Sequence, residues 1–248
     1  MPTRLHSVVV DTADPAASAR FWSTATGWPI TYEAADEVVV APTGDEVGLP
    51  TGPGIPLVFG ASGDRKVVKN RVHLDLASTS AAHQAELVER VRRAGATPLD
   101  IGQGAVPWVI LADPDGNEFC ILEPREEYAD TGAVAAIVVD TPDPAASAPF
   151  WEAASDWRAE LLPDGNARLT RPDGGGPRLE LVANDDPRVV KNRLHIDVAP
   201  AAADDQAAEV DRLLARGARP ADVGQGEETW VVLADPDDNE FCVLSPRD

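Results

Sequence analysis

A twelve-residue segment occurs twice in this chain, and this repeat constrains the fold more than any other feature of the sequence. The segment VVKNRVHLDLAS covers residues 67–78 and returns as VVKNRLHIDVAP over residues 189–200, with eight of the twelve positions unchanged. Similar segments precede and follow both copies. We therefore interpret the chain as a tandem repeat, in which each half contains the same elements in the same order.

The repeated segment predicts a β-strand with one polar face. His73 and Asp75 alternate with apolar residues in VHLDL, and His195 and Asp197 do so in the second copy. A period of two residues is typical of a strand that turns one face toward the core. On the inner face of a curved sheet the polar pair would line a cavity, whereas on an outer face it would meet solvent. The pattern is compatible with both placements.

The remaining signals predict the same succession of elements in each half. A β-branched strand precedes Asp14-Pro15 and again Asp143-Pro144, and each pair is typical of the capped first turn of a helix. A second helix is predicted over residues 81–94, and two strands joined by a turn that begins Asp-Pro-Asp close each half. Each half thus predicts two β-α-β-β-β modules.

Size and charge restrict the classes of function. A chain of 248 residues is long enough for two domains, and no apolar run approaches the roughly 20 residues of a membrane-spanning helix. The formal net charge of -21 would repel a phosphate backbone, so we expect no nucleic-acid partner. The N-terminal segment has no signal-peptide pattern, which predicts a cytoplasmic protein. The two cysteines occupy equivalent positions, so a disulfide framework is not expected.

The endings of the two halves, DPDGNEFCIL and DPDDNEFCVL, together with the RVHLDL strand, carry a family resemblance. The chain resembles the vicinal oxygen chelate superfamily, which includes glyoxalase I, bleomycin-resistance proteins and extradiol dioxygenases, and more narrowly the actinobacterial glyoxalase-like domain proteins. The resemblance implies an α+β fold of four β-α-β-β-β modules, which form two tandem domains with cupped mixed sheets. The domains are expected over residues 1–124 and 134–248, with a connection at 125–133. Pairing of modules within a half, across halves or between chains is compatible with the sequence.

The resemblance also implies a set of metal-ligand positions, one on the first and one on the last strand of each module. Neither half holds a complete quartet of His, Gln and Glu, because Val58 and Ala135 occupy two of these positions. The chain is therefore compatible with a divalent metal, namely Zn, Fe, Ni or Mn, on an incomplete set of ligands, or with no cofactor. In the first half the set is His6, His73 and Cys120, and in the second half it is Glu180, His195 and Cys242.

Acid–base chemistry is predicted from the polar residues of the same strands. His73, Asp75 and Glu118 in the first half, with His195 and Glu240 in the second, are the candidate catalytic residues. A satisfied polar network around His73 and a thiol that acts as a small apolar group are the structural alternatives. The Lys-Asn-Arg triplets at 69–71 and 191–193 would either gate an anionic ligand or form ion pairs with nearby carboxylates, and we favour the ion pairs.

Three functions are compatible with these features. The first is a glyoxalase-like lyase or isomerase that acts on a small oxygenated organic molecule, and we favour this enzyme. The second is a small-molecule binding protein without turnover, similar to the bleomycin-resistance proteins that sequester a drug. In the third, one half has lost its site and supports the other. The expected partner is a small molecule, and the chain is expected to be a monomer or a homodimer.

Overall fold

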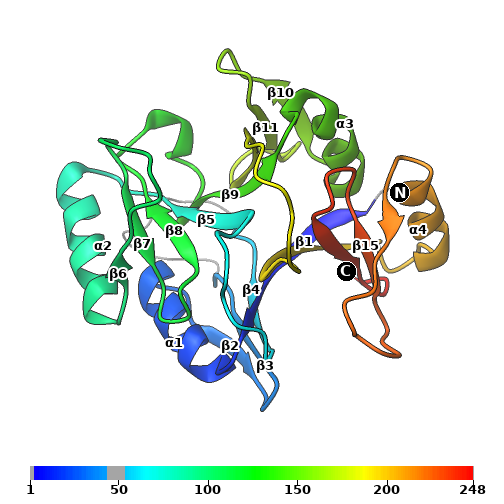
Figure 1. The fold of residues 1–248 in the computed structure, drawn as a ribbon, viewed down its shortest axis with the longest axis horizontal. Coiled ribbons are helices and arrows are strands. Elements are labelled where there is room, and N and C mark those ends of the chain that lie inside the picture. The colour runs from blue at the N-terminus through cyan, green and yellow to red at the C-terminus, as the bar shows by residue number, and fades with distance from the viewer. Residues whose placement is uncertain (1–2, 44–53, 248) are drawn as a thin grey trace.

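Each half of the chain folds into two modules of the order strand, helix and three strands, as the repeat predicts (Figure 1). The computed structural model describes residues 3–43 and 54–247. The first half contains β1 (Arg4–Thr12), α1 (Pro15–Thr26), β2 (Ile30–Glu33), β3 (Glu37–Val40) and β4 (Leu57–Ala61), then β5 (Val72–Leu76), α2 (Ala81–Arg93), β6 (Thr97–Pro98), β7 (Val109–Ala112) and β8 (Glu118–Ile121). The short helix η1 (Glu126–Tyr128) follows. The second half contains β9 (Val134–Thr141), α3 (Pro144–Ser155), β10 (Arg158–Leu161), β11 (Ala167–Thr170) and β12 (Arg178–Ala183), then β13 (Leu194–Ala199), α4 (Gln206–Leu214), β14 (Arg219–Pro220), β15 (Val231–Ala234) and β16 (Glu240–Val243).

The modules pair across the two halves of the sequence. One sheet, sheet A, has the order β14-β15-β16-β13-β1-β4-β3-β2 and joins the fourth module to the first. The other, sheet B, has the order β10-β11-β12-β9-β5-β8-β7-β6 and joins the third module to the second. In each sheet the modules meet through an antiparallel pair, β1 with β13 and β5 with β9. The connection at 125–133 therefore separates two halves of the sequence, while each sheet contains strands of both.

Local sequence signals fix the ends of the first helix in each half. The Asp14 side chain accepts a hydrogen bond from the backbone N–H of Ala17, and Asp143 does the same for Ala146. A proline follows each cap, where the missing N–H costs nothing. Gly27 ends α1 with a φ of 77°, a left-handed conformation that a residue without Cβ adopts readily.

Aromatic residues of these helices form the core between the modules of each half. Trp22 on α1 and Trp151 on α3 are both 1% exposed. Each packs edge-on against the phenylalanine of a last strand, Trp22 on Phe119 and Trp151 on Phe241. Packing between the modules of a half is thus carried by helices, and pairing across the halves is carried by the sheets.

Two arginines fasten each half to the other. Arg193 donates hydrogen bonds to Asn117 Oδ1 at 3.0 Å and to the carbonyl of Asp11 at 2.8 Å. Arg71 donates the equivalent bond to Asn239 Oδ1 at 2.9 Å. Each arginine therefore binds residues of the half to which it does not belong. The two repeats stabilise each other through these contacts.

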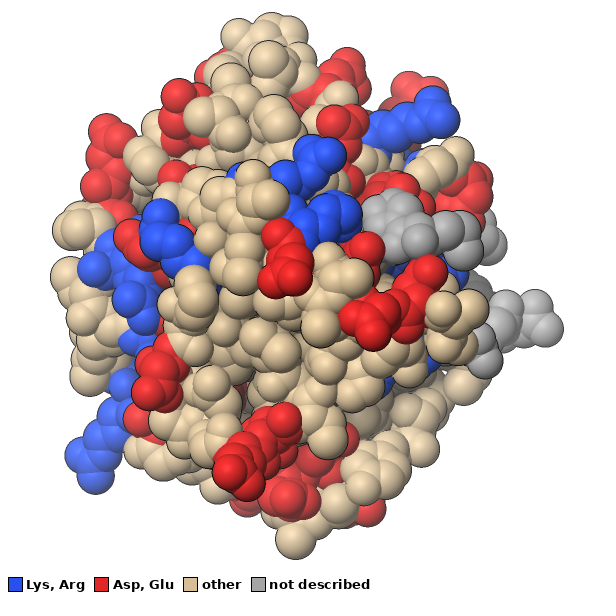
Figure 2. All heavy atoms as spheres, turned by 90° about the vertical axis from the view of Figure 1, so that its right-hand side faces the viewer, with Lys and Arg blue, Asp and Glu red and all other residues tan. Residues whose placement is uncertain are grey.

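The chain contains 42 acidic and 21 basic residues. Figure 2 shows acidic and basic side chains interspersed over one face of the molecule, with apolar and neutral residues between them. No helix in the described part of the chain is long and apolar enough to cross a membrane.

Candidate functional site

Each sheet carries a His–Asp–Cys group on one face, which we call its site face. In sheet A, His195 and Asp197 lie two residues apart on β13, and Cys242 of β16 is paired with Asp197. One ligand atom from each of the three residues lies within 4.8 Å of the others. His73, Asp75 and Cys120 form the equivalent group on sheet B. The alternation in the sequence therefore places the predicted histidines beside their cysteines, as expected.

The cross-half pairing divides both predicted metal sets. His6 lies on β1 in sheet A, whereas His73 and Cys120 lie in sheet B, so the set predicted for the first half does not come together. The prediction failed because it assumed that the strands of one half share a site.

The second-half set is divided in the same way. Glu180 lies on β12 in sheet B, apart from His195 and Cys242. The sheets instead bring His6 to the face of His195, and Glu180 to the face of His73. Asp197, which was not among the predicted ligands, belongs to the group in sheet A.

His6 reaches the site face of sheet A through a β-bulge. The register of β1 against β13 shifts between Leu5 and Ser7, so His6 is the extra residue between them. Bulges commonly re-aim a side chain next to a functional site. Burial lowers the pKa of His6 below its ordinary value, and the nearby Arg247 adds to this effect while Asp197 opposes it. The imidazole is therefore neutral at neutral pH and able to accept a proton or bind a metal.

The Asp197 carboxylate in sheet A is buried and only half satisfied. Its Oδ2 accepts a 3.0 Å hydrogen bond from Ser7 Oγ, while Oδ1 has no hydrogen-bond partner and lies 3.6 Å from His195 Nε2. Burial raises the pKa of Asp197, and burial together with the adjacent carboxylate raises the pKa of the Cys242 thiol. A positively charged ligand between these groups would satisfy the orphaned oxygen and favour both ionised forms.

The predicted proton carriers Glu118 and Glu240 are engaged by cations and backbone groups. Glu118 forms an ion pair with Lys66 at 2.7 Å and accepts the backbone N–H of Asn70. Glu240 forms the equivalent pair with Arg188. Both side chains are buried or nearly so, and their contacts hold the loops that lead into β5 and β13. These interactions give both glutamates a structural role, and their role in proton transfer stays a prediction.

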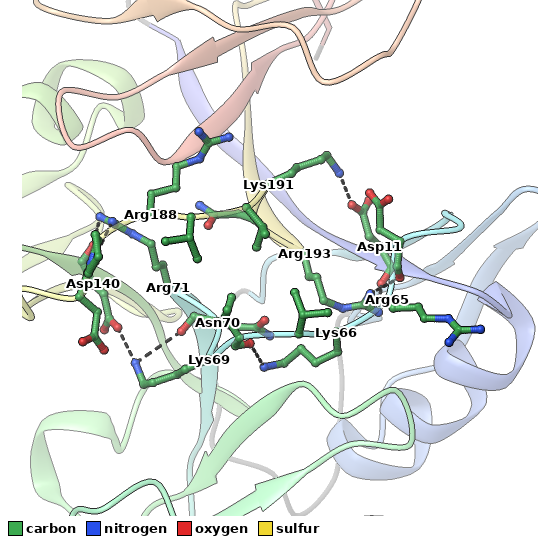
Figure 3. A pocket seen from close by; sticks show the side chains of 18 residues that line it. Asp11, Arg65, Lys66, Lys69, Asn70, Arg71, Asp140, Arg188, Lys191 and Arg193 are labelled. Carbon is green, nitrogen blue, oxygen red and sulfur yellow. Dashed lines mark hydrogen bonds and ion pairs between the residues drawn. The ribbon is translucent and has the colours of Figure 1, made fainter.

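The two loops that precede the histidine strands face each other across a cavity of about 400 Å³ (Figure 3). All three lysines of the chain line this cavity. Lys69 is paired with Asp140, and Lys191 with Asp11. The ion-pair interpretation therefore holds for the two lysines of the triplets, whereas Arg71 and Arg193 donate to amide and backbone carbonyl oxygens.

A larger cavity, of about 780 Å³, lies over the site face of sheet A. It reaches the His195 group and His6 at one side, and its floor includes the apolar side chains Val39 and Val58. Trp230, which immediately precedes β15, lines the cavity and keeps 36% of its surface exposed. The volume is within the range of small-molecule sites in proteins.

The site face of sheet B is covered by a side chain of the connection between the halves. Tyr128 of η1 is only 4% exposed and packs against Cys120 and Ala135. Its hydroxyl donates a 2.7 Å hydrogen bond to Glu180 Oε1, which also accepts a 3.0 Å bond from Arg168 Nε. Burial and the Glu180 carboxylate raise the pKa of Tyr128, so the phenol stays protonated and remains the donor. No periodic pattern in the sequence marks this single tyrosine.

The registers show why the two faces differ. In sheet B, Val138 is paired with Glu180 on one neighbouring strand and with His73 on the other. In sheet A, Val9 is paired in the same way with Val58 and His195, so Val58 takes the position of Glu180. Arg168 is paired with Glu180, and Val39 is paired with Val58. The polar pair that holds Tyr128 over sheet B is thus replaced by two valines in sheet A.

Comparisons with known proteins agree with this architecture. The family model described as a glyoxalase-like domain matches twice, over residues 7–122 and 136–244. Glyoxalase I from Zea mays superposes with a TM-score of 0.65 at 15% identity, covering 98% of this chain and 92% of that one. A putative dioxygenase from Bacillus subtilis gives a TM-score of 0.63 at 12% identity, covering 98% and 85%. At these identities the likeness shows a common fold.

No curated protein matches the chain in sequence. The two family matches together span most of its length, and they coincide with the repeat from which the four modules were predicted. The chain therefore belongs to the glyoxalase-like domain family, with two such domains in tandem and the strands of each sheet drawn from both.

Proposed function

We propose that this protein is a metal-assisted enzyme of the glyoxalase-like class, which binds a small oxygenated organic molecule in the cavity over sheet A. His195, Asp197 and Cys242 would hold the divalent metal. The proposal is carried by the Asp197 group, in which one carboxylate oxygen has no hydrogen-bond partner and each residue offers a ligand atom within 4.8 Å of the others, beside a cavity of about 780 Å³. Asp75 in sheet B has an equivalent oxygen without a partner, but Tyr128 covers its group.

The donor set fits a metal. Imidazole, carboxylate and thiolate are ligands of Zn²⁺, and three protein ligands with an open fourth position are the usual arrangement of catalytic zinc. A buried carboxylate oxygen without a partner is costly, and a bound cation would remove this cost. Burial raises the pKa values of the thiol and the carboxyl, which favours their protonated forms. Metal binding would therefore release these protons.

Such a metal, when bound, supplies a Lewis acid that polarises a carbonyl and stabilises the oxyanion formed from it. His6 is the residue placed to move a proton, because its imidazole is neutral, lines the same cavity and is not hydrogen-bonded to Asp197. The valines of the floor exclude water from the apolar part of the substrate. Asp197 is held in orientation by Ser7, which leaves Oδ1 directed at His195.

Only one of the two site faces would act. Tyr128 covers the His73 group in sheet B, and its hydroxyl binds Glu180, which the family resemblance assigns as a metal ligand and which the cross-half pairing brings to this face. Sheet B would then support sheet A through the shared arginine contacts. This arrangement differs from the expected loss of a site in one half, because the covered face belongs to a sheet that contains strands of both halves.

Binding without turnover is the second candidate, and one observation favours it. Glu240, the carboxylate predicted to move protons in this cavity, forms an ion pair with Arg188 and accepts the backbone N–H of Asn192. If His6 also fails to act, the cavity retains an apolar floor and an exposed tryptophan, which suffice to hold a ligand.

Metal analysis of matched variants tests the proposal. Full-length protein, purified without a metal-affinity tag, is expected to bind about one Zn²⁺ per chain. Asp197→Asn should abolish tight binding, whereas the equivalent change Asp75→Asn should leave it intact because Tyr128 covers that face. Zinc binding that is unchanged in Asp197→Asn, or lost equally in Asp75→Asn, would refute the assignment.

Turnover separates the two candidate functions. A panel of small α-hydroxy and α-keto carbonyl compounds should be converted by the zinc-loaded protein, and His6→Ala should lose turnover while retaining zinc. A protein that binds members of the panel but converts none of them would be the binding protein of the second candidate.

A further inference from the structure

The Tyr128 side chain occupies the position over the site face of sheet B that a bound ligand would take. The ring lies beneath two guanidinium groups, with Arg168 at 5.5 Å and Arg125 at 5.8 Å from its centroid. Arg125 in turn lies 5.6 Å from the Trp108 ring. The ring is therefore held by stacked cations and by one hydrogen bond at its edge. A site face of this fold can therefore hold an aromatic ring in place of solvent.

Sheet A has equivalents of the tryptophan and of one arginine, with a cavity beside them. Trp230 and Arg247 are the equivalents of Trp108 and Arg125, and both line the cavity of about 780 Å³. In sheet B the tryptophan is half-buried and its Nε1–H donates to Gln103 at 2.9 Å, whereas Trp230 is exposed. A cation and an indole thus face a cavity of small-molecule size.

The residues around the tyrosine hydroxyl of sheet B are replaced in sheet A, and this replacement indicates which ligand the cavity would accept. Val39 and Val58 replace the polar pair Arg168 and Glu180, and both valines line the cavity. A hydroxyl at the ring edge would lose water there without gaining a partner, which is unfavourable. A ring edge that carries hydrogen or an alkyl group would instead bury apolar surface against the valines.

We propose that the cavity over sheet A takes a planar aromatic ring in the position that Tyr128 occupies over sheet B, stacked by Arg247 and Trp230, with an apolar edge toward Val39 and Val58. The inference rests on the proposed function, in that the substrate enters this cavity, and it names the substrate class as a small aromatic compound. Oxygen substituents of the ring would point toward the His195 group.

Small probes test the aromatic requirement. Phenol and cyclohexanol have similar size and the same hydroxyl, and they differ in the π face that a cation recognises. Phenol should shift the indole N–H resonance of Trp230 in the full-length protein, assigned with Trp230→Phe, and should bind roughly two- to fivefold more tightly than cyclohexanol. Arg247→Gln should remove this preference, and Arg92→Gln, an exposed arginine on α2, should retain it. Equal binding of both probes would overturn the inference.

An exchange of wall residues tests the ring edge. The wild-type protein should prefer 4-methylphenol to benzene-1,4-diol, because both probes keep one hydroxyl for the His195 group and differ only at the opposite ring edge. The double variant Val39→Arg, Val58→Glu, which recreates the wall of sheet B, should prefer benzene-1,4-diol. An unchanged ratio in a folded double variant would overturn the assignment. If the variant does not fold, the Arg247→Gln comparison still decides. Zinc binding without any ring preference would contradict this inference alone, and ring binding without zinc would contradict the metal assignment alone.

Discussion

The Tyr128 hydroxyl donates a 2.7 Å hydrogen bond to Glu180 Oε1, and through this contact the connection between the halves covers the site face of sheet B. The equivalent of Glu180 in sheet A is Val58, which lines an open cavity instead. Two substitutions between otherwise similar modules, Val58 for Glu180 and Val39 for Arg168, thus distinguish a face that binds its own chain from a face that can bind another molecule.

Removal of the Tyr128 ring should destabilise the protein and open sheet B. Tyr128→Ala should lower the free energy of unfolding by about 3 kcal/mol or more, because a large buried side chain is lost and a cavity remains. Tyr128→Phe should cost about 1 kcal/mol, since Arg168 still satisfies Glu180. Denaturant-induced unfolding measures both values.

A matched control for this prediction is Tyr32→Ala. Tyr32 is 54% exposed, so its truncation should change stability by less than about 0.5 kcal/mol. Phenol should also restore part of the stability of Tyr128→Ala, because a ligand that binds only the folded state stabilises it. A variant that is as stable as the wild type would show that the ring does not hold the connection in place.

The contact between Arg193 and the first half should contribute more to stability than any surface ion pair. Arg193 is 8% exposed and donates to Asn117 Oδ1 and to the backbone carbonyl oxygens of Asp11 and Asp64. Its truncation to alanine removes these three hydrogen bonds, of which only the one to Asn117 Oδ1 is backed by a second donor, Asn70 Nδ2. The loss should cost about 3 kcal/mol in thermal or denaturant unfolding. Arg92→Ala, which removes an exposed pair with Glu89, should cost less than about 0.5 kcal/mol.

The fold could be predicted because each signal is local and occurs more than once. The alternation around His73 and the Asp-Pro helix caps define strands and helices by themselves, and their repetition gives the number of modules. The pairing of modules was not predictable in this way. The edges that meet, β1 with β13 and β5 with β9, are apolar strands of similar pattern, so alternation identifies the buried face but not the partner strand.

The candidate site was therefore only half predictable. His195 and Cys242 come together within one module, and the sequence identified both. His6 was assigned to the wrong neighbours because its strand pairs with the opposite half. Tyr128 lies in a segment without periodicity, where neither its burial nor its bond to Glu180 leaves a signal in the sequence.

His6 should titrate below its ordinary pKa of 6.5 because burial and Arg247 disfavour its charged form. Its folded-state pKa is lower than that of the unfolded chain, so the unfolded state binds more protons between the two values. Stability should thus fall as the pH decreases through this window, and His6→Ala should show a weaker fall. NMR titration should also show a higher His6 pKa in Arg247→Gln, whereas an unchanged value would exclude the guanidinium as a cause.

The halves of the chain should depend on each other to fold. Fragments 1–124 and 134–248 each contain one module of sheet A and one of sheet B, so either fragment alone exposes the central edges β1 and β5 or β9 and β13. Unpaired central strands associate readily. Each fragment alone should therefore self-associate or remain unfolded, and refolding of an equimolar mixture should give a one-to-one complex with the helical content of the intact chain. Size-exclusion chromatography with light scattering and circular dichroism would measure this. Two stable monomeric fragments would mean that each half closes its own sheet, and the reciprocal contacts of Arg71 and Arg193 would then be secondary to pairing within a half.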